Sequence, residues 1–136
     1  MNHNNKIDTE KLIRYWKISS EDDYKTMLDM YKTKHYHWSL FMGHLVIEKL
    51  LKALYIKTNT NYPPPIHDLR RLLIKSKIEL SKEQILVYDT ITRFNIKARY
   101  DDYKSNFYKL CTAKFTNKWI LEIKKQKIWI ISLLAD

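Results

Sequence analysis

The sequence has very few of the residues that make tight turns. It holds one glycine, Gly43, and three prolines, which stand together at 63–65. An all-β protein of this length needs many turns, and turns favour residues that accept a positive φ. The composition therefore argues against an all-β fold and predicts a few long helices.

A single cysteine and the lack of long apolar runs exclude further classes of protein. Cys111 has no second cysteine with which to form an intramolecular disulfide. The longest apolar run, 128–135, is interrupted by Ser132 and falls far short of the roughly 20 residues that span a bilayer. Residues 1–6 are polar and lack the apolar core of a signal peptide. We therefore expect a cytoplasmic protein that does not engage a membrane.

The sequence also lacks the motifs of cofactor and metal sites. It has no glycine-rich phosphate loop. The pair His67 and Asp68 is similar to a metal-phosphohydrolase ligand pair, but such a site needs further ligands from other helices. His35 and His37 stand two apart, so they do not share a helix face. We predict no metal and no cofactor, and no nucleophilic role for Cys111, which has no evident base partner.

What the sequence does have is apolar residues and positive charge. Its 136 residues are 45% hydrophobic, which predicts one folded domain over 1–136, with 1–8 flexible. The formal net charge of +10 favours an anionic partner such as nucleic acid, a nucleotide or an acidic protein. The alternative is that lysines scattered over helix faces only keep the surface hydrated.

Apolar residues recur at helical spacing along most of the chain. The pattern predicts an all-α fold, an antiparallel up-and-down bundle of four to five helices. Residues 59–65 form a loop, and 99–110 read as irregular. The expected helices cover 9–32, 36–57, 66–75, 82–98 and 116–134.

Several helix ends and faces follow from local residues. Thr9 is the expected N-cap of the first helix and Ser81 that of the fourth. The inner stripe of the first helix contains Ser19 and Asp23; alternatively, a capping box of Ser20 and Asp23 starts a new helix there. The expected inner stripe of the fourth helix is Ile85, Asp89, Thr92 and Ile96.

Two groups of polar residues are candidates for a site. Asp23, His44 and Glu48 are expected to form a buried polar network, with Lys52 or Arg93 as a further partner for a carboxylate; it is either a ligand pocket or a structural lock. Candidate ligands for RNA or nucleotide phosphate come from the end of the fourth helix: Arg93, Asn95, Arg99 and Tyr100. Alternatively, Arg93 only pairs with Asp89 or Asp23.

Four stretches in this order resemble the HEPN family of helical-bundle domains. Segment 14–23 is a helix with an acidic residue on its inner face. Segment 44–55, HLVIEKLLKALY, is similar to the family's EK-KA helix, and 63–73, PPPIHDLRRLL, is similar to its proline–HDL segment. Segment 98–101, ARYD, is similar to an ARY signature with Asp101 in place of proline. The resemblance covers about 14–131.

The resemblance implies a homodimer that binds RNA or nucleotide, or that pairs with a minimal nucleotidyltransferase. Some members are ribonuclease toxins of toxin–antitoxin pairs, in which an arginine is followed by a histidine and then a tyrosine. Here Arg93 and Tyr100 match, but Ala98 stands at the histidine position. We therefore predict no nuclease activity. The alternatives are a ribonuclease toxin with a non-standard site and a protein-binding adaptor.

Overall fold

The computed structural model describes residues 7–135, apart from the side chains of Asp101 and Asp102. These residues form six helices and no strand. The helices are α1 (Thr9–Lys32), α2 (Tyr36–Asn59), α3 (Leu69–Lys75), α4 (Lys82–Lys97), α5 (Asp101–Leu110) and α6 (Ala113–Leu134). None of these six is long and apolar enough to cross a membrane.

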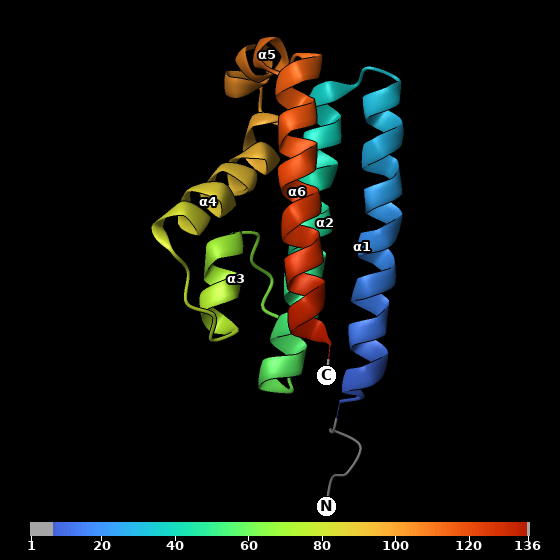
Figure 1. Ribbon diagram of the computed structural model, residues 1–136, viewed down its shortest axis with the longest axis vertical. Helices are drawn as coiled ribbons and strands as arrows, with labels where there is room; N and C mark the ends of the chain where they lie inside the picture. Colours follow the sequence, from blue (N-terminus) through green and yellow to red (C-terminus); the bar gives the residue numbers. More distant parts are fainter. Residues whose placement is uncertain (1–6, 136) are drawn as a thin grey trace, which may run out of the picture.

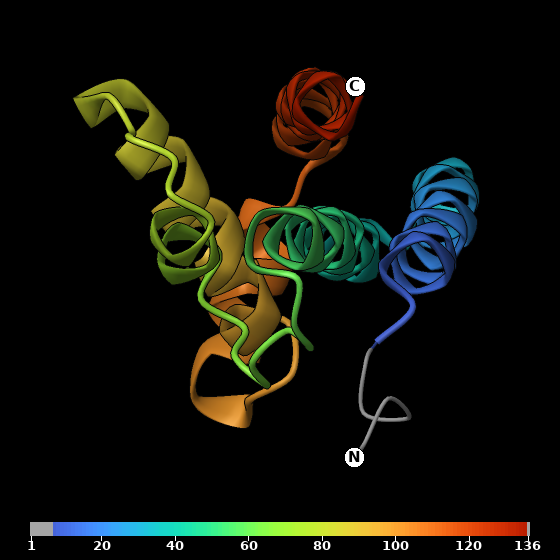
Figure 2. The same ribbon diagram turned by 90° about the horizontal axis from the view of Figure 1, so that it is seen from below.

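Helix α2 lies at the centre of the bundle and contacts each of the other helices (Figure 1). Seen from below, α1 lies on one side of α2, α3 and α4 lie on the opposite side, and α6 runs along a third side (Figure 2). Helices α1, α2, α4 and α6 run alternately up and down (Figure 1). The predicted all-α up-and-down bundle is therefore confirmed.

Helix α5 is the element that the sequence did not predict, and it raises the number of helices above the expected four to five. The segment 99–110 carries aromatic residues on several sides, which hides the apolar face. Among the described side chains of this segment only Phe107 is buried, and its ring lies 5.6 Å from that of Phe94 on α4. Tyr103 and Tyr108 remain more than half exposed. Contact with α4, rather than a clear periodic pattern, positions this helix.

Side-chain caps explain where most of the described helices begin. Ser81 caps α4 as predicted, and with Gln84 it forms a capping box. The N-cap of α1 is Asp8, whose carboxylate accepts the backbone N–H of Lys11, so Thr9 is the first helical residue instead. Residues 1–6, most of the segment expected to be flexible, lie outside the described part of the chain.

Two other predicted boundaries were wrong by three residues each. Asp68 is the N-cap of α3, so this helix begins at Leu69 and not at residue 66. Thr112 caps α6, which begins at Ala113 and not at residue 116, because the Thr112 hydroxyl accepts the backbone N–H of Phe115. Both caps are small polar residues that satisfy a free N–H of the first turn.

The predicted inner stripe of α4 was wrong. The structure buries Tyr88, Ile91 and Phe94 in its place, while Ile96 is 43% exposed. Aromatic rings bury the largest apolar area, so they decide which face turns inward. Tyr88 tolerates complete burial because its hydroxyl donates a hydrogen bond of 2.8 Å to Oε1 of Gln126 on α6.

Helix α1 is continuous, so the alternative of a new helix starting at Ser20 was wrong. Ser20 lies against α2, and its hydroxyl donates to the backbone oxygen of Val46 at 2.8 Å. Gly43 lets α2 approach both neighbours, since an added methyl group would overlap the end of the Ile123 side chain and lie 3.2 Å from Sδ of Met27. Small residues therefore set the close packing around α2.

Candidate functional site

Glu48 is the centre of a polar cluster on one face of α2. Its side chain is only 6% exposed, and its two oxygens have different partners. Oε2 lies 3.2 Å from Nζ of Lys52 one turn later, and Oε1 lies 2.8 Å from Nδ1 of His67. A buried carboxylate is costly unless it is paired, and here a cation and a ring N–H both pair with it.

His44 joins the same cluster from one turn earlier on α2. It is completely buried, and its Nε2 donates to the backbone oxygen of His67 at 2.9 Å. Its Nδ1 is buried without a hydrogen-bond partner among the described residues. Together, His44 and Glu48 bind the backbone and ring of His67, so they fix the loop before α3 against α2.

Burial lowers the pKa of His44 below its ordinary value of 6.5. The hydrogen bond from its Nε2 to the His67 carbonyl and the charge of Glu48 act in the opposite direction and raise it, whereas the nearby charges of His67 and Arg99 lower it further. Desolvation dominates, because a buried imidazolium loses its hydration. His44 is therefore neutral at pH 7.

Asp23 belongs to a different ion pair from the one that the sequence suggested. Its Oδ2 lies 2.6 Å from Nζ of Lys49, which also donates to the hydroxyl of Ser19 at 2.7 Å. Asp23 and Ser19 do face α2, as expected. The structure thus brings His44 and Glu48 together and places Asp23 in a separate α1–α2 contact.

At the end of α4, Arg99 is exposed and held by its neighbours. Its Nε donates to the backbone oxygen of Asn95 at 3.0 Å. The guanidinium carbon lies 5.3 Å from the ring centre of Tyr100 and 5.8 Å from that of Phe41 on α2. Three of the four expected phosphate ligands, Asn95, Arg99 and Tyr100, therefore lie together.

Arg93 lies on another face of α4. Arg99 comes six positions later, just beyond the end of α4, and a turn of roughly 100° per residue leaves the two side chains roughly 120° apart around the helix axis. Its guanidinium contacts the hydroxyl of Thr90 at 3.4 Å. The alternative pairing of Arg93 with Asp89 was also wrong, because Asp89 contacts Arg70 on α3 at 3.4 Å.

The position of His67 in the cluster with Glu48 was not predicted from the sequence. His67 belongs to a loop, and its contact with Glu48 joins residues 19 apart. The signal that was available is that both residues lie in stretches with a family resemblance. The loop after α2 folds back along that helix and brings His67 to Glu48. The periodicity of residues within one helix does not predict such a contact.

The arrangement is able to bind an anion and to move a proton. Arg99 presents an exposed planar cation, which suits phosphate. The His67 ring is 63% exposed while its Nδ1 contacts a carboxylate, and this is the geometry of an imidazole base. Burial raises the pKa of Cys111 to about 12, so its thiol stays protonated. Among the described side chains, no group of three histidine, cysteine, aspartate or glutamate residues is arranged to hold a metal ion.

Acid should destabilise the protein as the pH falls below about 6.5. The pKa of His44 is lowered in the folded state, so between the folded and unfolded pKa values only the unfolded chain binds the proton. The contribution of His44 to the free energy of unfolding is therefore complete above a pH of about 6.5 and is lost as the pH falls through the folded-state pKa. Burial, then the charges of Lys104 and His35, lowers the pKa of His37 as well, with the same sign.

Urea unfolding at about pH 7.5 and about pH 5.5 measures this effect. His44→Asn should be less stable at the higher pH and should show a smaller loss between the two. Equal pH dependence in the two proteins would contradict the role of His44.

The fold and this cluster define an all-helical bundle domain with a buried polar cluster on its central helix. The family model for the HEPN domain matches residues 13–125. The chain therefore belongs to the HEPN family. Searches of curated proteins and of solved structures give no match.

Proposed function

We propose that this HEPN domain binds RNA through the end of α4, without nuclease activity. The observation that carries the proposal is the exposed Arg99 guanidinium, oriented by the Asn95 carbonyl and flanked by the rings of Tyr100 and Phe41. A planar cation held this way offers two parallel N–H groups to a phosphate. The net charge of +10 adds long-range attraction for a polyanion.

A polymer suits this surface better than a free nucleotide does. The sequence has no phosphate-binding loop, and Arg99 lies on an open face rather than in an enclosed pocket. Absence of cleavage follows from position 98. Ala98 has no side-chain group that transfers a proton, and it is completely buried.

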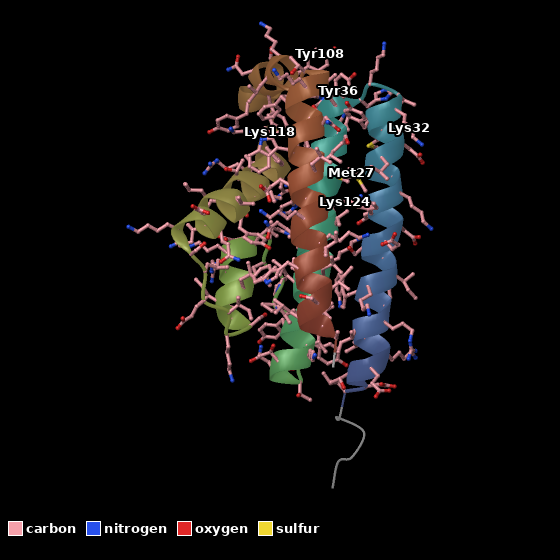
Figure 3. All side chains as sticks on the ribbon, in the orientation of Figure 1. Met27, Lys32, Tyr36, Tyr108, Lys118 and Lys124 are labelled. Atoms are coloured by element: carbon pink, nitrogen blue, oxygen red, sulfur yellow. The ribbon has the colours of Figure 1, made fainter. Side chains whose placement is uncertain are left out.

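Arg99→Ala should weaken binding of a labelled single-stranded RNA by about 5–10-fold at low salt, because it removes a charged hydrogen-bond donor. Fluorescence anisotropy measures the affinity, and its logarithm should fall linearly with the logarithm of salt concentration. Arg93→Ala is the matched control, since it removes an exposed arginine from α4 on a face turned away from Arg99. Lys124→Ala tests charge on α6, where Figure 3 places that lysine along the helix.

The three variants separate a local site from diffuse attraction. Equal losses in Arg93→Ala, Arg99→Ala and Lys124→Ala would show that only the overall charge matters. A parent protein that fails to bind RNA at low salt would contradict the proposal and favour the protein-binding adaptor.

We further propose that the protein forms a homodimer and that a minimal nucleotidyltransferase is its partner protein. Both proposals rest on the family, in which dimers and nucleotidyltransferase partners occur. The dimer is also supported by exposed apolar side chains on α6, which are Leu121, Ile128 and Ile131. Light scattering at micromolar concentration should give twice the monomer mass. A monomer at every concentration would contradict the dimer.

One observation favours a second function, a ribonuclease toxin with a non-standard site. His67 is an exposed imidazole with a carboxylate partner, and Arg99 lies close enough to His44 to lower its pKa. An imidazole paired with a carboxylate, as His67 is with Glu48, is able to accept the 2′-hydroxyl proton, while Arg99 would stabilise the charge on the phosphate. Cleavage of RNA in the presence of chelator that disappears in His67→Gln would support this function over binding alone.

A further inference from the structure

The end of the bundle where α5 meets the start of α2 carries two neighbouring hollows. His37, Trp38, Lys104 and Tyr108 are among the residues that line the first, with a volume of about 510 Å³. His37 and Tyr108 also line the second, of about 340 Å³. Figure 3 shows Tyr36 and Tyr108 together at this end. Both volumes fall in the range of ligand sites, roughly 300–1,000 Å³.

Rings and cations alternate across this surface. Nζ of Lys104 lies 5.6 Å from the ring centre of Trp38. The His37 ring lies 5.0 Å from that of Trp38 and 5.4 Å from that of Tyr108. Tyr108 is 64% exposed, although it packs edge-on against His37. An aromatic ring this exposed presents a free face to a planar ligand.

Lysines supply positive charge to this surface. Lys34, Lys104 and Lys109 are exposed and line one or other of the hollows. Among the described side chains that line either hollow there is no aspartate or glutamate. The surface is therefore suited to a ligand that combines negative charge with flat rings.

We infer that this surface, formed by His37, Trp38, Lys104 and Tyr108, stacks the unpaired bases of single-stranded RNA while its lysines hold the phosphates. Stacking on aromatic rings with backbone contacts to cations is how proteins bind single strands. In a duplex the base faces are already stacked on one another, so they are not available to Trp38 and Tyr108. An acidic peptide would use the lysines and leave the exposed ring of Tyr108 without a role.

The inference rests on the proposed function and extends the same site. The Phe41 ring lies 5.7 Å from that of Trp38, and the Arg99 guanidinium lies over this same Phe41 ring. Aromatic contacts thus run from Arg99 across the start of α2 to Tyr108. A strand bound at Arg99 is able to continue onto this end of the bundle.

The test compares three probes: a single-stranded RNA of roughly ten nucleotides, the duplex of the same sequence, and heparin, a polyanion without bases. Tyr108→Ala should weaken binding of the single strand about five-fold or more and leave heparin binding unchanged. Tyr108→Phe, which keeps the ring, should bind like the parent. Lys104→Gln should weaken binding of both the single strand and heparin.

Tyr62→Ala is the matched control, because Tyr62 is 62% exposed and follows the opposite end of α2. Normal single-strand binding in Tyr108→Ala and Lys104→Gln, with a loss in Arg99→Ala, would overturn the inference and leave the proposed function in place. Equal losses for heparin and single strand in Tyr108→Ala would also overturn it. Failure of the parent protein to bind any RNA would overturn both.

Discussion

Glu48→Ala should lower the free energy of unfolding by about 2–4 kcal/mol. The substitution leaves the Lys52 ammonium, only 10% exposed, without the carboxylate 3.2 Å away. It also removes the acceptor for Nδ1 of His67, which helps to fix the loop against α2. Nζ of Lys52 also lies 5.3 Å from the centre of the Trp16 ring, and this cation–π contact offsets a small part of the lost stability. Urea unfolding followed by circular dichroism at pH 7 measures the change.

Glu21→Ala is the control for this effect. Glu21 also pairs with a lysine, Lys127, at 3.0 Å, but its side chain is 48% exposed. An exposed pair of this kind contributes about 1 kcal/mol or less. Glu48→Gln separates charge from hydrogen bonding, since the amide oxygen still accepts from His67. If Glu48→Ala and Glu21→Ala have the same stability, the cluster around Glu48 is not a buried lock.

Ala98→His should destabilise the protein by about 2–4 kcal/mol and should not create cleavage of RNA. Ala98 has no exposed surface and lies in the hydrophobic core, so an imidazole there both overfills the core and buries a polar ring. The same substitution at Ile96, which is 43% exposed, should change stability by about 0.5 kcal/mol or less. Thermal unfolding and an RNA cleavage assay with chelator check both parts.

A stable Ala98→His protein that cleaves RNA would contradict this expectation. It would mean that the core opens at the end of α4 enough to expose residue 98. It would also show that the rest of the nucleolytic site is in place.

The long helices could be predicted from the sequence because each one has its own apolar face. Apart from the start of α6, the four long helices begin and end within two residues of their predicted bounds. Helix α5 could not be predicted in this way, because Tyr103 and Tyr108 look apolar in sequence and yet are exposed. The buried face of α4 was predicted wrongly for a related reason. The hydroxyl of Tyr88 donates to Gln126 on another helix, and the sequence of α4 alone does not reveal this partner.

The candidate site was predictable only in part. The spacing of His44, Glu48 and Lys52 by four residues already places them on one face of α2. The contribution of His67 depends on how a loop returns to that helix, which local patterns do not encode. The separation of Arg93 from Arg99, in contrast, follows from the turn of roughly 100° per residue along α4 and was available in the sequence.

The central position of α2 has a consequence for the order of folding. Helices α1 and α2 are joined by a short turn, so they are able to pair early at a small entropic cost. Helix α6 reaches α2 only across a long stretch of chain; Lys57, for example, donates to the carbonyl of Leu133, 76 residues away. We therefore expect α6 to dock last and to detach first. Its amide hydrogens should exchange with solvent before those of the α1–α2 pair.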